Sequence, residues 1–145
     1  MIPMSPNPDV VERRLAHQRD LLAELRKLLP LSVTRLSAEP VTRAAVERMM
    51  QAVVDLALDI NGHIAASNLG RAPSTGRESF DLMVEARVLD QRQADALKPA
   101  VGLRNVLVHL YADIDVTLIV NSTVAFEAAF SDYVRTVARW LLTHG

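Results

Sequence analysis

Hydrophobic residues recur at intervals of three and four along most of the chain, which is the spacing of one face of an α-helix. One such stretch begins after Asp9, a suitable N-cap, and ends at Pro30, after which LSVTRLSAEP predicts a short linker. Another, residues 41–68, contains no proline and predicts a long helix that ends in the loop SNLGRAPSTG. The apolar stripes comprise Val11, Leu15, Leu22, Leu25 and Leu29 in the first helix, and Val46, Met49, Met50, Val53, Leu56, Ala57, Ile60 and Ile64 in the second.

The remaining residues predict three more helices. Residues 79–89 form a short amphipathic helix, and residues 91–110 form one bent helix because Pro99 removes a backbone donor. The β-branched run at 116–120 predicts a short helical turn, since a lone strand would have no partner. The last helix, residues 123–142, has Val124, Phe130, Val134, Val137, Trp140 and Leu141 as expected core residues.

About five helices therefore predict an all-α bundle with an up-and-down core. The 145 residues suit a single domain spanning 1–145, with 1–7 as a disordered lead-in. Half of the residues are hydrophobic, which is enough for a real core.

Composition excludes several classes of site. The chain has no cysteine, which rules out disulfides, thiolate metal sites and cysteine nucleophiles. Its net charge of −1 argues against a strongly basic nucleic-acid platform but leaves room for a small basic cleft. The chain start resembles no secretory signal, and no run approaches the roughly 18 apolar residues that span a bilayer. We expect a soluble cytoplasmic protein with no membrane contact.

The stretch GLRNVLVHLYAD, residues 102–113, places side chains that could bind a ligand or take part in catalysis on a predicted helix. With about 100° per residue, one side is apolar and is expected to face the core. The opposite arc has an apolar centre ringed by polar groups, which indicates a surface covered by a partner. The apolar side comprises Leu103, Val106, Leu107 and Leu110, and the opposite arc comprises Arg104, Asn105, Val108, His109 and Tyr111.

Arg104 and His109 lie about 140° apart around the helix axis and would not touch on one straight helix. They converge if the helix unwinds near Asp113. They also converge across a twofold axis where the surface meets its own copy, which would make the site a property of a dimer.

Polar residues at every fourth position mark the long second helix: Glu47, Gln51, Asp55, Asp59 and His63. They form a solvated face with an Asp59–His63 pair, or Asp55, Asp59 and His63 line the same cleft as Arg104. A metal site is a weaker alternative, because the Glu-x-x-His pair of helix-bundle metal sites is absent. No nucleophile elbow and no glycine-rich phosphate loop occurs in the sequence.

The motif Arg104-Asn105-x-Leu107-x-His109-x-Tyr111 resembles the R-N-x-L-x-H-x-Y signature of the HepT toxins, a family in the HEPN superfamily. LDINGHI, residues 58–64, resembles the IDIANHI segment of that family. YADID at 111–115, the loop with Pro73 and the helix with Phe80 also fit. The resemblance covers nearly the whole chain, and the core motif shows no departure.

This resemblance implies a HEPN-type bundle with a kinked motif-bearing helix and a homodimeric, metal-independent endoribonuclease without a cofactor. The two motifs would line a cleft at the subunit interface and cut RNA. It also implies a type VII-like toxin–antitoxin system, in which an MntA-like nucleotidyltransferase antitoxin silences the toxin by attaching AMP to Tyr111.

Each motif residue suits this chemistry. His109 would transfer protons near neutral pH, and a dimer would supply two such histidines, one from each subunit. Arg104 would bind the phosphate. Asn105 would orient the imidazole or bind phosphate. The basic side of the first helix, with Arg13, Arg14, Arg19, Arg26 and Lys27, would serve solubility, RNA or an acidic surface of the antitoxin.

A second function remains open, namely a non-catalytic helical binding module that only docks the nucleotidyltransferase. Cleavage of RNA without metal distinguishes the two.

Overall fold

The computed structural model describes residues 8–109 and 115–144, and every regular element in these residues is a helix. The prediction of an all-α bundle is therefore confirmed, with six helices in place of about five. They are α1 (Pro8–Leu28), α2 (Val33–Ala38), α3 (Pro40–Leu69), α4 (Gly76–Glu85), α5 (Gln91–His109) and α6 (Val116–His144). None of these helices is long and apolar enough to cross a membrane.

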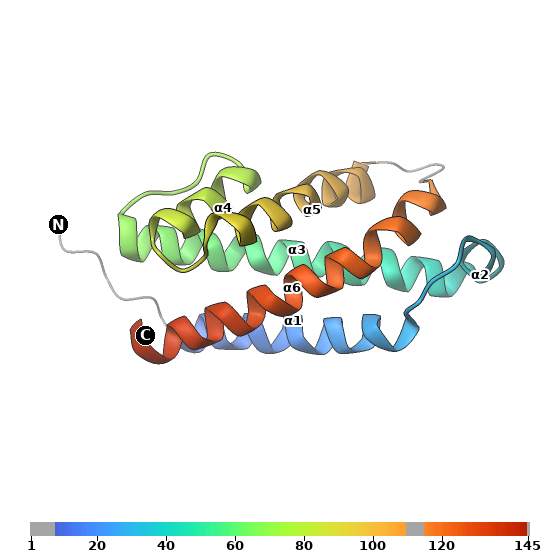
Figure 1. The fold of residues 1–145 in the computed structure, drawn as a ribbon, viewed down its shortest axis with the longest axis horizontal. Coiled ribbons are helices and arrows are strands. Elements are labelled where there is room, and N and C mark those ends of the chain that lie inside the picture. Colours follow the sequence, from blue (N-terminus) through green and yellow to red (C-terminus); the bar gives the residue numbers. More distant parts are fainter. Residues whose placement is uncertain (1–7, 110–114, 145) are drawn as a thin grey trace.

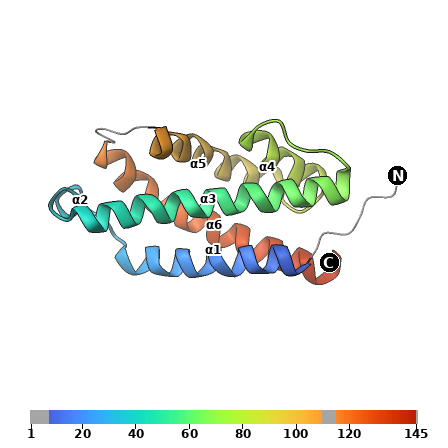
Figure 2. The ribbon, with the colours of Figure 1, turned by 180° about the vertical axis from the view of Figure 1, so that it is seen from behind.

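The long helix α3 runs through the middle of the molecule. Figures 1 and 2 show α1 on one side of it and α4 with α5 on the other, while α6 crosses the bundle next to α1 and α5. The short helix α2 covers one end (Figure 1). α1 begins and α6 ends at the opposite end, so the end of α5 and the end of α6 lie far apart.

The core is built around one apolar stripe of α3, which includes Val46, Met50, Val53, Ala57, Ile60 and Ile64. Each of the valine, isoleucine and methionine side chains in it contributes roughly 1.5–3 kcal/mol when fully buried. Aromatic rings close the core above this stripe. Tyr133 of α6 meets Phe80 of α4 and Phe130 edge to face, with ring centroids 6.2 and 6.0 Å apart.

A buried polar network links three helices inside this core. The Tyr133 hydroxyl donates to Oδ1 of Asn61 at 2.7 Å, and Nδ2 of Asn61 donates to Oγ of Ser79 at 3.1 Å. Ser79 in turn donates to the carbonyl of Gly76 at 2.6 Å. Burial raises the pKa of Tyr133 well above its ordinary value, so the phenol stays protonated and remains a donor.

Two local predictions were wrong, each for a physical reason. The linker after Pro30 contains the helix α2, because the Ser32 hydroxyl accepts the backbone N–H of Arg35 at 3.0 Å and Leu36 is buried in the core. Val124 was expected in the core but is 63% exposed. It follows the buried Thr123 by one residue and so points about 100° away from the core face.

The β-branched run at 116–120 is helical, as predicted, but it is the first turn of α6 rather than a separate turn. Ile119 is fully buried and anchors this start of the helix. α5 likewise continues as one helix through Pro99.

We predict that Tyr133→Phe lowers the free energy of unfolding by about 1–3 kcal/mol, because Oδ1 of the buried Asn61 loses its donor. Urea denaturation followed by circular dichroism measures this change. Ser122→Ala is the control, since it removes an exposed hydroxyl that bonds the carbonyl of Leu118 at 2.6 Å and should stay within about 0.5 kcal/mol of the parent. Equal unfolding midpoints for the two variants would contradict the prediction.

Candidate active site on α5

The side chain of Arg104 is held against α3 by an ion pair. Its Nε donates to Oδ1 of Asp55 at 2.7 Å, and the two side chains are 29% and 37% exposed. Nη1 of Arg104 also donates to Oδ1 of Asn105 at 3.4 Å, a long hydrogen bond. The guanidinium is therefore positioned from two helices before any ligand arrives.

The buried stripe of α5 explains why Arg104 faces α3. Ala94, Leu97 and Val101 are buried, and Arg104 continues their spacing three residues further on. The prediction that Arg104 lies on the arc away from the core was therefore wrong. Residues 103 and 106–108 are partly buried like Arg104, and of the side chains predicted to face the core, Leu103 and Leu107 pack against it.

The structure places the other predicted motif residues unevenly. Asn105 is exposed beside Arg104. His109 is the last residue of α5, and its side chain lies outside what the structure describes. Tyr111 also falls outside the described residues. The roles assigned to His109 and Tyr111 stay predictions.

The polar stripe of α3 is divided among different neighbours. Asp55 contacts the motif through Arg104, whereas Asp59 faces Arg14 of α1, with 3.8 Å between the closest charged atoms. Glu47 pairs with Arg43 on the same helix at 2.9 Å. His63 is partly buried on α3, and its carbonyl accepts the Ser67 hydroxyl at 2.9 Å. Of the two aspartates predicted to line the cleft, Asp55 is the one that contacts a motif residue among the side chains that the structure describes.

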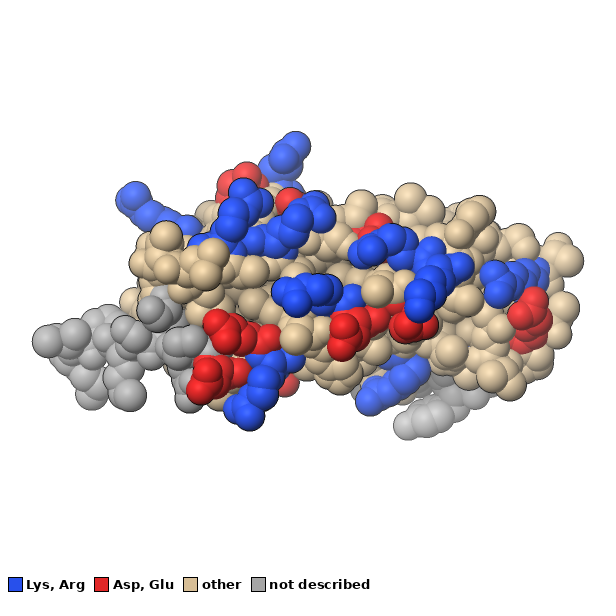
Figure 3. Space-filling model, turned by 90° about the horizontal axis from the view of Figure 1, so that it is seen from below, with Lys and Arg blue, Asp and Glu red and all other residues tan. Residues whose placement is uncertain are grey.

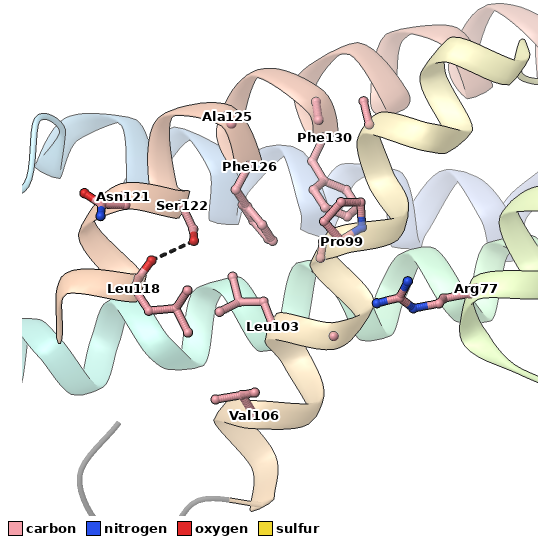
Figure 4. A pocket seen from close by; sticks show the side chains of 14 residues that line it. Arg77, Pro99, Leu103, Val106, Leu118, Asn121, Ser122, Ala125, Phe126 and Phe130 are labelled. Atoms are coloured by element: carbon pink, nitrogen blue, oxygen red, sulfur yellow. Dashed lines mark hydrogen bonds between the residues drawn. The ribbon is translucent and has the colours of Figure 1, made fainter. Parts of the chain in front are cut away.

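An apolar hollow of about 660 Å³ lies between α5 and α6, and its α5 wall is a different side of the helix from the one that carries Arg104. Figure 4 shows Leu103, Phe126 and Phe130 lining it, with Arg77 at one side and Ser122 near the start of α6. Gly102 makes room for Arg77, because a Cβ at position 102 would lie 3.1 Å from the guanidinium. Sequence reasoning missed this hollow, since its walls come from helices that are separate in the sequence.

A metal site finds no support in the geometry. Within residues 8–109 and 115–144, no three His, Cys, Asp or Glu side chains gather where they could hold a metal ion. The groups around Arg104 are instead suited to binding an anion, since arginine stays protonated and its planar fork matches phosphate oxygens.

These features define an all-α bundle with a half-buried Arg–Asp pair between α3 and α5 and an apolar hollow between α5 and α6. The family described as ribonuclease HepT-like matches residues 19–137. The chain therefore belongs to the HepT-like ribonuclease family, and the resemblance carried by the motif is confirmed.

Two relatives carry nuclease names. A tRNA nuclease HepT of Aphanizomenon flos-aquae is 29% identical over 136 residues, which are 94% of this chain and 92% of that protein. An mRNA nuclease HepT of Shewanella oneidensis is 32% identical over 72 residues, which are 50% of this chain and 54% of that protein.

Solved structures share the fold. A tri-AMPylated HEPN toxin of Shewanella oneidensis, in complex with its MNT antitoxin, superposes with a TM-score of 0.80 at 21% identity, covering 90% of this chain and 98% of that one. YutE of Bacillus subtilis, described as a cytosolic protein of unknown function, superposes with a TM-score of 0.83 at 18% identity, covering 97% and 94%.

We predict that the Arg104–Asp55 pair couples energetically by roughly 0.5–1 kcal/mol, because it is short and partly shielded from water. A double-mutant cycle of Arg104→Gln and Asp55→Asn, measured by urea denaturation, tests this value. The matched cycle uses Arg14→Gln and Asp59→Asn, whose longer and more exposed pair should couple close to zero. Equal coupling energies in the two cycles would contradict the claim that Asp55 holds Arg104 more strongly than an exposed ion pair would.

Proposed function

We propose that this chain is the endoribonuclease toxin of a toxin–antitoxin pair and that it cuts RNA without metal. The observation that carries the proposal is the intact motif from Arg104 to Tyr111 inside the segment that matches the ribonuclease family. The relatives named tRNA nuclease and mRNA nuclease support RNA as the substrate.

The reaction uses the nucleophile that RNA carries. The 2′-hydroxyl gives up its proton and attacks the adjacent phosphorus, and the 5′-oxygen leaves with a proton. The products are a 2′,3′-cyclic phosphate and a 5′-hydroxyl. His109 is the proton carrier, because an imidazole accepts and donates protons near neutral pH.

Arg104 stabilises the charge that gathers on the phosphate. Asp55 binds Nε of Arg104, so the guanidinium presents its terminal nitrogens to a ligand. A prealigned donor costs little reorganisation at the moment of reaction. Asn105 lies next to these nitrogens and either binds a phosphate oxygen or orients the imidazole.

A second copy of the chain completes the site in this proposal. The apolar side chains of residues 103 and 106–108 are only partly buried, and Leu118 on α6 is 41% exposed beside the same hollow. Covering this face with its own copy would bury these groups and bring a second His109 to the cleft. Two imidazoles could then serve the two opposite sides of the in-line displacement.

The proposed regulator is an MntA-like nucleotidyltransferase. The Tyr111 oxygen attacks the α-phosphorus of ATP, pyrophosphate leaves, and AMP remains on the tyrosine. The added phosphate brings bulk and negative charge to the cleft and repels RNA. Support comes from the tri-AMPylated HEPN toxin solved with its MNT antitoxin, which has the same fold as this chain.

We predict that His109→Ala lowers the rate of tRNA cleavage in excess chelator by about 10²- to 10⁴-fold, because the proton carrier is lost. Gel electrophoresis of labelled tRNA measures the rate. Arg104→Ala should lower the cleavage rate by a similar factor. Arg104→Lys should retain only part of the activity, because lysine lacks the planar guanidinium.

The control is His17→Ala, which removes an exposed histidine on α1 and should cleave like the parent. Circular dichroism and the elution volume must match across all variants. A parent protein that cuts no RNA but binds the nucleotidyltransferase would support the non-catalytic binding module instead.

We predict that Tyr111→Phe abolishes AMP transfer, because the acceptor hydroxyl is gone. Intact-mass measurement after incubation with ATP and an MntA-like nucleotidyltransferase reads out the modification. The parent should gain AMP and lose cleavage, whereas the variant should gain none. The only other tyrosine, Tyr133, is fully buried and offers no competing acceptor. AMP on Tyr111→Phe would place the modification elsewhere.

A further inference from the structure

A second hollow, of about 740 Å³, lies between α1 and the final third of α6. It is called the α1–α6 groove here. Its floor is apolar and includes Leu15, Ala138 and Leu141, and three arginines stand around it. The groove lies toward the end of the bundle where α1 begins and α6 ends, away from the end of α5 (Figure 1).

The three arginines approach the α1–α6 groove from two helices. Arg19 comes from α1, while Arg135 and Arg139 are one turn apart on the same face of α6. All three are exposed. Figure 3 shows that arginine and lysine gather on this side of the molecule, with acidic residues along part of it.

Carboxylates neutralise only one member of this cluster in part. Arg135 has Asp132 at 3.9 Å and interacts electrostatically with Glu127, whereas among the described residues neither Arg19 nor Arg139 has an ion pair. One acidic residue, Glu12, lines the groove. Elsewhere arginines are closely paired, as with Arg26 and Glu127 at 2.8 Å. The groove therefore carries an excess of about two positive charges on a chain whose net charge is −1.

The chemistry of the groove fits an RNA backbone. Unpaired guanidinium groups bind phosphate oxygens through two parallel hydrogen bonds, and several of them together release condensed counterions from the nucleic acid. The open apolar floor leaves room for a ribose or an unstacked base, which stacks well on arginine. An acidic protein surface would also match the charge, but the proposed substrate is already a polyanion.

The distance between the proposed cleavage site and the α1–α6 groove determines how large an RNA must be to contact both. Leu103, which precedes Arg104 on α5, lines the same hollow as Ser122 of α6, and α6 continues from there to the α1–α6 groove at Arg139. Ser122 and Arg139 are about 25 Å apart along the helix axis at 1.5 Å per residue. A short oligonucleotide in the cleft cannot reach the groove, whereas a folded RNA such as tRNA can.

We propose that the α1–α6 groove is a second RNA-binding site, in which Arg19, Arg135 and Arg139 hold the phosphate backbone of a substrate that is cut at Arg104. This inference rests on the proposed function. The groove makes the enzyme prefer long or folded RNAs, because only these contact both sites.

The test compares two substrates. The triple variant Arg19→Gln, Arg135→Gln, Arg139→Gln is assayed on whole tRNA and on a short oligonucleotide that spans the cleavage position mapped with the parent. We expect kcat/KM on tRNA to fall tenfold or more, mainly through KM, and kcat/KM on the oligonucleotide to stay within twofold. The slope of log K against log salt for tRNA binding should shrink by about 2, since phosphate contacts are lost.

The matched control removes three positive charges elsewhere, with Arg48→Gln, Arg71→Gln and Arg92→Gln, all exposed residues outside the groove. This control should change tRNA cleavage less than threefold. If the triple variant behaves like the control, or if both of its substrates slow equally, the proposal is overturned. Arg139→Gln alone decides the question if the triple variant unfolds, and should still raise KM for tRNA.

Measuring tRNA binding without cleavage distinguishes failure of this inference from failure of the proposed function. Fluorescence anisotropy with labelled tRNA, in the His109→Ala background, measures affinity without cleavage. If the parent cuts no RNA, the proposed function fails, yet weaker tRNA binding by the groove variant would still support the second site. Unchanged tRNA affinity together with loss of nucleotidyltransferase binding would overturn it in favour of an acidic protein partner.

Discussion

Burial of α3 is the constraint on which the rest of the structure depends. This helix contacts α1, α4 and α5 along its length, so its apolar stripe must fit several partners at once. The polar residues of this helix recur along one stripe between these contacts, and Asp55 is one of them. The core that fixes α3 thereby fixes the carboxylate that holds Arg104. Placement of the guanidinium is a consequence of core packing rather than of α5 alone.

The hydrophobic spacing was enough to predict five of the six helices, because each long helix buries a repeating face. The spacing failed where a short helix depends on a single cap or on the burial of one residue, and where it leaves the orientation of a helix open. α2 depends on the Ser32 cap and on the burial of Leu36, and neither stands out in a short run. Val124 was misplaced because hydrophobicity alone does not fix the phase of a helix, whereas the buried Thr123 does.

The candidate site divides in the same way. A local motif predicted which residues carry the chemistry, since reactive types at fixed spacing on one helix can be read directly. The partner of Arg104 could not be read with the same certainty, because Asp55 is 49 residues away and only the packing of α3 against α5 joins them. The placement of Arg104 on α5 was misjudged because the window began after Ala94 and Leu97, whose buried stripe continues to Arg104, whereas Leu103 and Leu107 pack against the core as predicted.

The distribution of arginines relates the proposed cleavage site to the α1–α6 groove. A chain with a net charge of −1 gains little from long-range attraction to RNA, because exposed charges are screened within about 10 Å in salt. Affinity must then come from a few arginines placed where phosphates will lie. One is held at the cleft by Asp55, and others stand unpaired at the α1–α6 groove. A rigid helix is the simplest way to keep such separate points at a fixed distance, and α6 is continuous from one hollow to the other.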